Sequence, residues 1–173
     1  SNYGAMKLAS EAQIAAAAES LLEQVNIFRF PNVVGIPATH GVIFDFVNKL
    51  INDPNQLHVL GNGTQQKAYL HAADLIDAML LIANNPLRKK IEVFNIGPVD
   101  NGVTVKWIAE QVVNRINPQA KILYGEGNKG WIGDVPKFNY STDKLQALGW
   151  KPHLGSEAAI TKAVDQIAHE LGF

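Results

Sequence analysis

The feature that most restricts the fold is an alternation of β-rich runs with helix-forming segments along the whole chain. Short runs of Val, Ile, Phe and Tyr that end near Gly or Pro predict strands, and longer segments with apolar residues at helical spacing predict helices. The predicted strands are residues 25–30, 57–60, 67–71, 91–96 and 121–124. The predicted helices are residues 5–22, 42–51, 74–84, 104–116, 142–148 and 156–171. Strands that alternate with helices in this way predict a protein of the α/β class.

The first predicted helix, residues 5–22, is rich in Ala, Leu and Glu and contains neither Gly nor Pro. These residues favour the helix strongly. The few polar side chains leave a broad apolar surface, so we expect this helix to pack on a sheet.

Composition and charge exclude several classes of function. Of the 173 residues, 47% are hydrophobic and 18% are charged, which is typical of a globular domain. The formal net charge is -1 and Lys and Arg do not cluster, so we expect no nucleic acid among the partners. No apolar run reaches the roughly 18 residues of a membrane span and no signal-peptide pattern opens the chain, so we expect no membrane contact and a cytoplasmic location. The chain has no cysteine and its five histidines are scattered, so we expect no metal site.

Tyr3 and Lys7 lie four residues apart at the start of the first predicted helix, so their side chains share one face. Such a pair suits proton removal from a sugar hydroxyl. An unperturbed tyrosine has a pKa of about 10 and is a poor base at neutral pH, and a neighbouring ammonium favours the phenolate. Tyr140 and Lys144 have the same spacing. The pair alone is therefore weak evidence, and the surrounding motifs decide its meaning.

Five blocks of sequence follow one another along the chain. It opens with S-N-Y-G-A-M-K-L-A-S-E, continues with R-F-P-N-V-V-G at residues 29–35 and G-N-G-T-Q-Q-K-A-Y-L-H at residues 61–71, and ends with F-N-I-G and then G-D-V-P before L-G-W-K-P. These blocks resemble the NAD-dependent epimerase/dehydratase family of the extended short-chain dehydrogenase/reductase superfamily, and within it the UDP-glucose 4-epimerases. The resemblance implies the C-terminal part of an extended Rossmann-fold epimerase: the last core helix and strands, and a smaller mixed α/β substrate-binding domain.

The resemblance also implies a division of the chain. Residues 1–35 correspond to the end of the NAD-binding Rossmann domain and residues 36–173 mostly to the substrate-binding domain, with residues 72–97 returning to the Rossmann sheet. The G-x-x-G-x-x-G turn that holds the dinucleotide pyrophosphate has no counterpart here, so the chain corresponds to the C-terminal half only. We expect the longer enzyme to bind NAD and to form a homodimer, this chain alone to be inactive, and strands 25–30 and 91–96 to lack their remaining sheet partners.

The family's functional residues map onto several positions. The tyrosine of the family is the catalytic acid/base and its lysine binds the nicotinamide ribose, so the resemblance implies catalytic and cofactor-binding roles for Tyr3 and Lys7. Pro31 maps to the nicotinamide end of the cofactor site. The implied substrate-binding residues are Asn32, Val42, Lys67, Lys129, Trp131 and Asp134. For Asn32, the alternative is a turn residue that bonds its own backbone.

Two positions depart from the family pattern. Lys67 stands where the family has an arginine that holds the diphosphate, and a lysine keeps the charge but not the bidentate fork; its alternative is an exposed strand residue. Trp131 stands where a second phosphate-binding arginine is usual, with Lys129 two residues upstream. Either Lys129 replaces that arginine, or the indole stacks on a base or sugar, or Trp131 fills the loop.

The function that the resemblance implies is a nucleotide-sugar epimerase, which transiently oxidises a sugar hydroxyl to a keto intermediate. A dehydratase of the same superfamily is an alternative, because the acidic residue that dehydratases add lies in the absent half. A non-catalytic module that binds a nucleotide sugar or a protein is another, although it has no use for the Tyr3–Lys7 pair. His71 and Asp74 are expected to be structural, with the histidine satisfied near a helix start and the aspartate capping or solvated.

Overall fold

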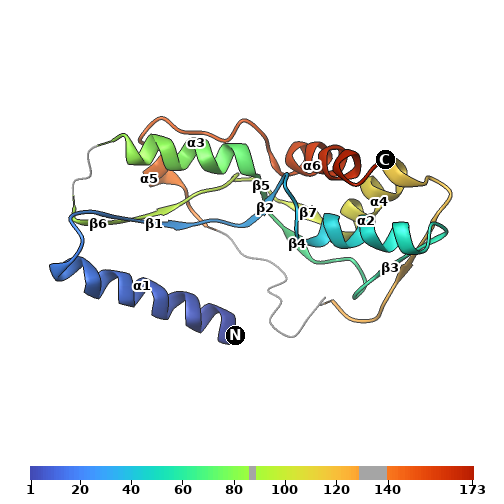
Figure 1. Cartoon of the computed structure of the whole chain (residues 1–173), viewed down its shortest axis with the longest axis horizontal. Helices are drawn as coiled ribbons and strands as arrows, with labels where there is room; N and C mark the ends of the chain where they lie inside the picture. Colours follow the sequence, from blue (N-terminus) through green and yellow to red (C-terminus); the bar gives the residue numbers. More distant parts are fainter. Residues whose placement is uncertain (86–88, 129–139) are drawn as a thin grey trace.

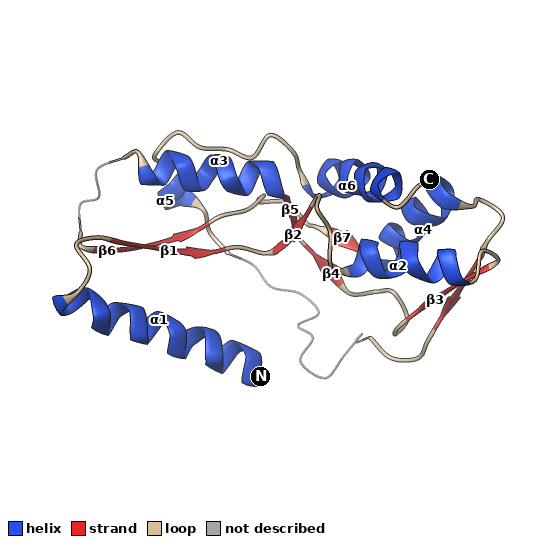
Figure 2. Cartoon of the chain, viewed as in Figure 1, coloured by secondary structure: helices blue, strands red, loops and turns tan. Residues whose placement is uncertain are grey.

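The computed structural model describes residues 1–85, 89–128 and 140–173 (Figure 1). The helices are α1 (Asn2–Ser20), α2 (Val42–Asn52), α3 (Ala72–Ala83), α4 (Val105–Ile116), α5 (Asp143–Gln146) and α6 (Ser156–Glu170). The strands are β1 (Val25–Arg29), β2 (Asn32–Val34), β3 (Gln56–Val59), β4 (Gln66–Lys67), β5 (Tyr69–His71), β6 (Ile91–Asn95), β7 (Val103–Thr104) and β8 (Lys121–Tyr124). Helices and strands are spread along an elongated molecule (Figure 2). The α/β class predicted from the sequence is confirmed.

The strands pair two by two. β1 runs parallel to β6, β2 to β5 and β3 to β8, whereas β4 and β7 are antiparallel. In the part of the chain that the structure describes, β1 and β6 have no strand partner except each other. The described sheet formed by residues 25–29 and 91–95 is therefore two strands wide.

Three details of the strand pattern differ from the prediction. β2 and β7, of three and two residues, were not predicted, because runs this short carry no alternation of burial that a sequence pattern can reveal. The strand predicted at residues 67–71 is broken at Ala68 into β4 and β5. β4 pairs with β7 and β5 pairs with β2. The break at Ala68 lets each piece form hydrogen bonds with its own partner strand.

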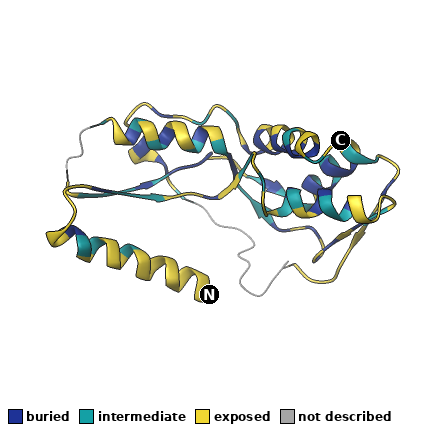
Figure 3. Cartoon of the chain, in the orientation of Figure 1, coloured by how far each residue is buried: buried dark blue, intermediate teal, exposed yellow. Residues whose placement is uncertain are grey.

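The larger hydrophobic core lies among α2, α4 and α6, which pack against one another. Figure 3 shows dark-blue buried positions on all three helices. The buried residues of α2 recur at the helical spacing that the sequence showed: Ile43, Phe46, Val47 and Leu50. Burying each such side chain contributes about 1.5–3 kcal/mol, which fixes this end of the molecule as a packed unit.

A second core lies between the β1–β6 pair and the helices α3 and α5. Its buried members are Leu70, Ala78, Ile82, Phe94, Ile96, Leu145 and Trp150. Trp150 belongs to the L-G-W-K-P block, so this block contributes an aromatic side chain to the second core. β2 and β5 lie in the middle of the molecule, between the β1–β6 pair with its core and the core of α2, α4 and α6 (Figure 1).

The first helix departs from its prediction. α1 contacts β1, but Ala18 is its one fully buried residue, and the helix is exposed along most of its length (Figure 3). The predicted apolar surface exists, but most of it is exposed. The described sheet that α1 contacts is only two strands wide, so it covers little of the helix. No helix within the described ranges is both long enough and apolar enough to cross a membrane.

Candidate functional site

A cavity of about 760 Å³ brings together residues that lie far apart in the sequence. Its wall includes the N-terminal end of α1, the segment from β2 to α2, and parts of β3, β4 and α4. Four of the predicted site residues line it: Tyr3, Asn32, Val42 and Lys67. The volume is within the range of about 300–1,000 Å³ that is typical of small-molecule sites.

The other predicted residues are not in the described wall of this cavity. Lys7 lies one helical turn beyond Tyr3 and is exposed, and Pro31 is buried beside the cavity. Lys129, Trp131 and Asp134 lie outside the described residues, so their predicted roles stay predictions.

Tyr3 and Lys7 lie on one face of α1. Ser1 caps this helix, since its hydroxyl accepts a hydrogen bond from the backbone N–H of Gly4 at 3.2 Å. The Nζ of Lys7 lies 5.3 Å from the centroid of the Tyr3 ring, within the range of a cation–π contact. The phenol is 65% exposed, and it faces the cavity as part of its wall. A phenol with a cation beside it, at the wall of a cavity, is suited to exchange a proton with a bound hydroxyl.

An ion pair fixes α1 to the strand that leads into the site. Arg29, the last residue of β1, donates from Nε to Glu11 Oε1 at 2.8 Å and from Nη2 to Oε2 at 2.5 Å. The hydrogen bond from Arg29, with its positive charge, lowers the pKa of the Glu11 carboxyl, and the same bond raises the pKa of Arg29. Glu11 is eight residues, about two helical turns, from Tyr3. This contact therefore ties α1 to the end of β1.

Pro31 lies under the turn that follows β6. A Cβ placed on Gly97 would come within 2.9 Å of Pro31 Cδ and closer still to the hydroxyl of Tyr140. That hydroxyl donates to the carbonyl oxygen of Pro98 at 2.6 Å. Burial, together with the nearby charge of Asp100, raises the pKa of Tyr140 to about 12. Tyr140 is thus a neutral structural donor that holds this turn against Pro31, and a glycine is required where the two approach.

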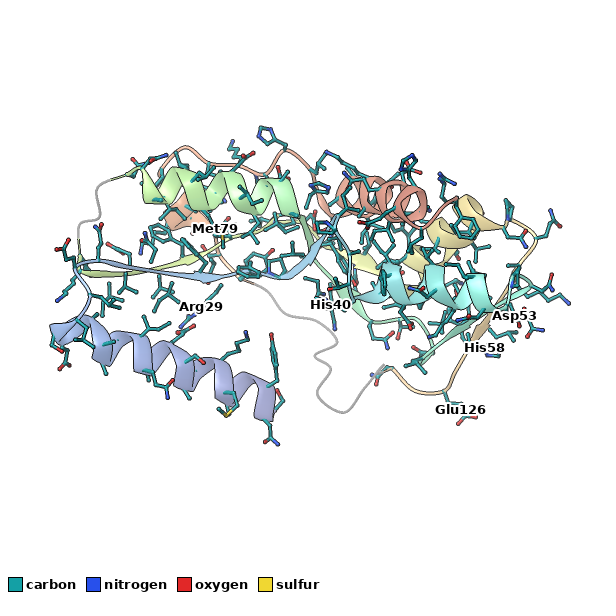
Figure 4. The ribbon with its side chains drawn as sticks, viewed as in Figure 1. Arg29, His40, Asp53, His58, Met79 and Glu126 are labelled. Carbon is teal, nitrogen blue, oxygen red and sulfur yellow. The ribbon has the colours of Figure 1, made fainter. Side chains whose placement is uncertain are left out.

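The wall also contains polar residues that were not predicted. His40 precedes α2 and its Nδ1 lies 3.1 Å from the Thr39 hydroxyl; Figure 4 shows it beside the start of that helix. Lys49 pairs with Asp45 at 2.7 Å within α2. Neither His40 nor Lys49 belongs to a conspicuous sequence motif, so their place in the cavity wall could be found only from the structure.

Gln65 is the most informative of the residues that the prediction missed. It lines the cavity, it is 3% exposed, and its side-chain Oε1 has no hydrogen-bond partner among the described residues. The sequence contained one signal for it, because the G-N-G-T-Q-Q-K block that carries Lys67 also carries Gln65. Its burial and its unsatisfied oxygen followed only from the structure.

His71 and Asp74 make structural contacts at the start of α3. His71 Nδ1 accepts from the backbone N–H of Ala73 at 3.2 Å, and its Nε2 lies 3.0 Å from Gln166 Oε1. The histidine is therefore satisfied near a helix start, as predicted. Asp74 is neither the helix cap nor solvated, which corrects its prediction: it is buried and accepts from the backbone N–H of Leu154 at 3.1 Å. The loop before α6 covers it, a contact that local sequence does not reveal.

A group able to hold a metal ion occurs where the sequence predicted none. Within the described residues, the ligand atoms of Asp74, Asp77 and His153 lie within 4.8 Å of one another. Asp77 and His153 are largely exposed and 3.7 Å apart, and Asp74 is already hydrogen-bonded to the backbone. The prediction missed this group because the histidine comes from a distant loop.

The family model described as "NAD dependent epimerase/dehydratase family" matches residues 1–97 of the chain. Among solved structures, a UDP-galactose 4-epimerase superposes with a TM-score of 0.85 and 33% identity, over 99% of this chain and 54% of the other. A UDP-glucose 4-epimerase of Thermotoga maritima, crystallised with UDP-glucose, gives a TM-score of 0.77 and 25% identity, over 98% and 54%. The dTDP-D-glucose 4,6-dehydratase of Mus musculus is 25% identical over 94% of this chain and 46% of its own length. The chain thus spans about half the length of these relatives.

Proposed function

Because the chain belongs to the NAD-dependent epimerase/dehydratase family, we propose that it is the C-terminal, substrate-binding portion of a nucleotide-sugar epimerase. Residues 1–35 complete the cofactor domain, and residues 36–173 form mostly the substrate domain, with residues 72–97 returning to the Rossmann sheet. Two features support this division: β6 pairs with β1, and the second hydrophobic core joins α3 and β6 apart from the core of α2, α4 and α6.

The observation that carries the proposal is that Tyr3 shares one cavity with Asn32 and Lys67. In the proposed reaction a sugar hydroxyl is oxidised to a keto group, which is then reduced from the opposite face to give the epimer. Tyr3 takes the hydroxyl proton at its phenolic oxygen in the first step and returns it in the second. Lys7, one turn along the same face, supplies the positive charge beside the ring.

The residues at the start of α1 fit the nicotinamide end of NAD. Tyr3 and Lys7 are exposed on one face, and a phenol and an ammonium are suitable partners for ribose hydroxyls. NAD, when bound, accepts and returns the hydride at the sugar carbon. Pro31, buried below Gly97, supports the loop at that end of the site. A longer protein would supply the pyrophosphate-binding turn, so this chain alone is proposed to be inactive.

The nucleotide sugar is proposed to lie along the cavity, with its diphosphate near Lys67. Lys67 is half-buried in β4, and Asn32 is exposed at the start of β2 on the same wall. Val42, half-buried at the start of α2, contributes apolar surface. Lys129, Trp131 and Asp134 lie outside the described residues and are proposed to bind substrate, with Lys129 in the place of the family's arginine or the Trp131 indole stacked on a base or sugar.

We also propose a homodimer formed through α1. The exposed apolar side chains of this helix and the turn after it are consistent with a covered surface: Met6, Leu8, Ile14, Leu21 and Leu22. Light scattering of the natural protein should give twice the monomer mass, and a Met6→Glu, Leu8→Glu double variant should be a monomer. A wild-type monomer would refute the dimer but not the epimerase.

The test is turnover by the natural protein that contains this chain, purified with NAD and supplied with UDP-glucose or UDP-galactose. Tyr3→Phe should lower kcat by about 10²–10⁴-fold, because proton transfer by a placed side chain contributes that much. Tyr124→Phe is the matched control, since Tyr124 is a tyrosine outside the described wall of the cavity. Equal kcat values for wild type and Tyr3→Phe would refute the role of Tyr3.

A dehydratase is the second candidate, supported by the likeness to the mouse dTDP-D-glucose 4,6-dehydratase. Proton NMR of the product separates the two reactions. An epimer of the supplied sugar supports the epimerase, and a 4-keto-6-deoxy sugar supports the dehydratase. Conversion of none of UDP-glucose, UDP-galactose and dTDP-D-glucose would refute both.

A further inference from the structure

The loop between β2 and α2, residues 35–41, is a continuous part of the cavity wall. Each of its residues lines the cavity, and none of them is buried. The loop contains neither a helix nor a strand, so no regular hydrogen-bonding pattern fixes its shape. The position of this wall therefore depends on the contacts that the loop makes with other elements.

The backbone of residues 36–40 forms one hydrogen bond with the rest of the described chain. The Ala38 N–H donates to Glu170 Oε2 at 3.3 Å. The contact between the Thr39 hydroxyl and His40 Nδ1 lies within the loop and ties it to no other element. Ala38 also packs against the larger hydrophobic core. Within the described residues, polar and apolar contacts of the loop thus meet at Ala38, and one carboxylate supplies the polar one.

Glu170 is presented by a helix that is itself firmly placed. It is the last residue of α6, whose buried face belongs to the larger core. Gln166 lies one turn earlier on the same face, and its Oε1 is 3.0 Å from His71 Nε2. That nitrogen lies 3.5 Å from the position of a Cβ on Gly35, the first residue of the loop. One face of α6 therefore lies against the start of the loop through His71 and holds its middle through Glu170.

Loss of the contact between Glu170 and Ala38 should weaken substrate binding by a modest factor. A carboxylate that accepts from a backbone N–H makes a charge-assisted hydrogen bond, but this pair is exposed. The net contribution of one hydrogen bond corresponds to about 2- to 10-fold in an equilibrium constant. A loop that is not held in place must be ordered when the ligand binds, and that cost reduces the affinity.

We propose that Glu170 is a positioning residue, whose carboxylate holds Ala38, and with it residues 36–40, in the arrangement that receives the substrate. Glu170 is not in the described wall of the cavity, so it acts through the loop and not by touching the substrate. It lies 132 positions along the chain from Ala38. The inference rests on the proposed function, because turnover of a nucleotide sugar is one of its measurements.

The first experiment is steady-state kinetics of the natural protein with NAD and whichever of UDP-glucose, UDP-galactose and dTDP-D-glucose it converts. Glu170→Ala should raise KM by about 2- to 10-fold. It should leave kcat nearly unchanged, because Tyr3 and Lys7 come from α1 and not from this loop. Glu170→Gln keeps an oxygen that accepts hydrogen bonds, so its KM should return toward that of wild type.

Glu157→Ala is the matched control. It removes a carboxylate from the first turn of the same helix, and within the described residues the Glu157 side chain makes no hydrogen bond or ion pair. Its KM should equal that of wild type. An equal rise in KM for Glu157→Ala and Glu170→Ala would assign the effect to lost negative charge alone and overturn the inference.

Amide hydrogen exchange measures the contact directly. Peptides that span residues 36–40 should exchange faster in Glu170→Ala than in wild type, Glu170→Gln and Glu157→Ala. A wild-type KM or wild-type exchange in Glu170→Ala would overturn the inference and leave the proposed function intact. A lower kcat and a lower unfolding midpoint with an unchanged KM would show a role in folding only, and would also overturn it. Absence of turnover by wild type would refute the proposed function and this inference with it.

Discussion

Gly102→Ala is expected to destabilise the protein through a collision at the β4–β7 pair. Gly102 precedes β7 and has a φ of 67°, in the left-handed region that favours glycine. A Cβ at this position would come within 2.7 Å of Ala68 N and closer still to the Lys67 carbonyl group. These are backbone atoms, so no side-chain rotation relieves the contact.

The magnitude follows from two contributions. The left-handed conformation costs an alanine about 1–2 kcal/mol, and forced repacking of a filled site costs about 1–3 kcal/mol. Gly102→Ala should therefore lower the free energy of unfolding by about 2–5 kcal/mol. Gly149→Ala is the matched control, because Gly149 has a φ of 87° and no atom within 4 Å of the added Cβ. It should show the conformational cost alone.

The assay is urea unfolding of wild type and both variants, followed by circular dichroism. The difference between the two variants, about 1–3 kcal/mol, isolates the steric cost, since the effect of alanine on the unfolded chain is common to both. Because the displaced atoms belong to Lys67 and Ala68, Gly102→Ala should also weaken nucleotide binding. Equal destabilisation by the two substitutions would refute the reasoning.

Three further predictions follow from contacts around the site. Tyr140→Phe leaves the Pro98 carbonyl without its donor and should cost about 1–3 kcal/mol in denaturant unfolding, with Tyr124→Phe as the comparison. The folded pKa of Tyr140, about 12, is above the unfolded value, so its contribution is complete below about pH 10 and is lost as the pH rises toward 12; an absorbance titration that ionises this phenol near its ordinary pKa would contradict this. Glu11→Gln should cost less than about 1 kcal/mol, because the pair is partly exposed. The folded pKa of Glu11 is lowered, so wild type should lose its advantage over Glu11→Gln as the pH falls through that value, and an advantage that persists in acid would count against the ion pair. Residues 1–173 expressed alone should bind NAD far more weakly than the natural protein in a fluorescence titration, and equal affinities would show that the cofactor site is complete here.

The sequence predicted most of the helices and strands, because their signals are local. The four apolar residues of α2 stand at helical spacing, and β1 and β6 are β-branched or aromatic runs ended by Pro or Gly. Short pairs such as β2–β5 and β4–β7 were only partly predicted, since two or three residues show no period and their partners are distant in sequence. The break at Ala68 is likewise a consequence of where each partner strand lies.

The site divides in the same way. Motif order indicated Tyr3, Asn32 and Lys67, which the structure gathers in one cavity, although their roles in catalysis and binding stay predictions. No motif indicated His40, and the unsatisfied oxygen of Gln65 is a property of burial, not of residue type. The sequence by itself determined the family, the element types and the residues that form motifs, because these depend on local spacing and residue chemistry. The tertiary structure alone decided which distant segments line the same cavity, which polar atoms are buried and which glycines have no room for a side chain. These properties depend on contacts between residues that are far apart in the sequence.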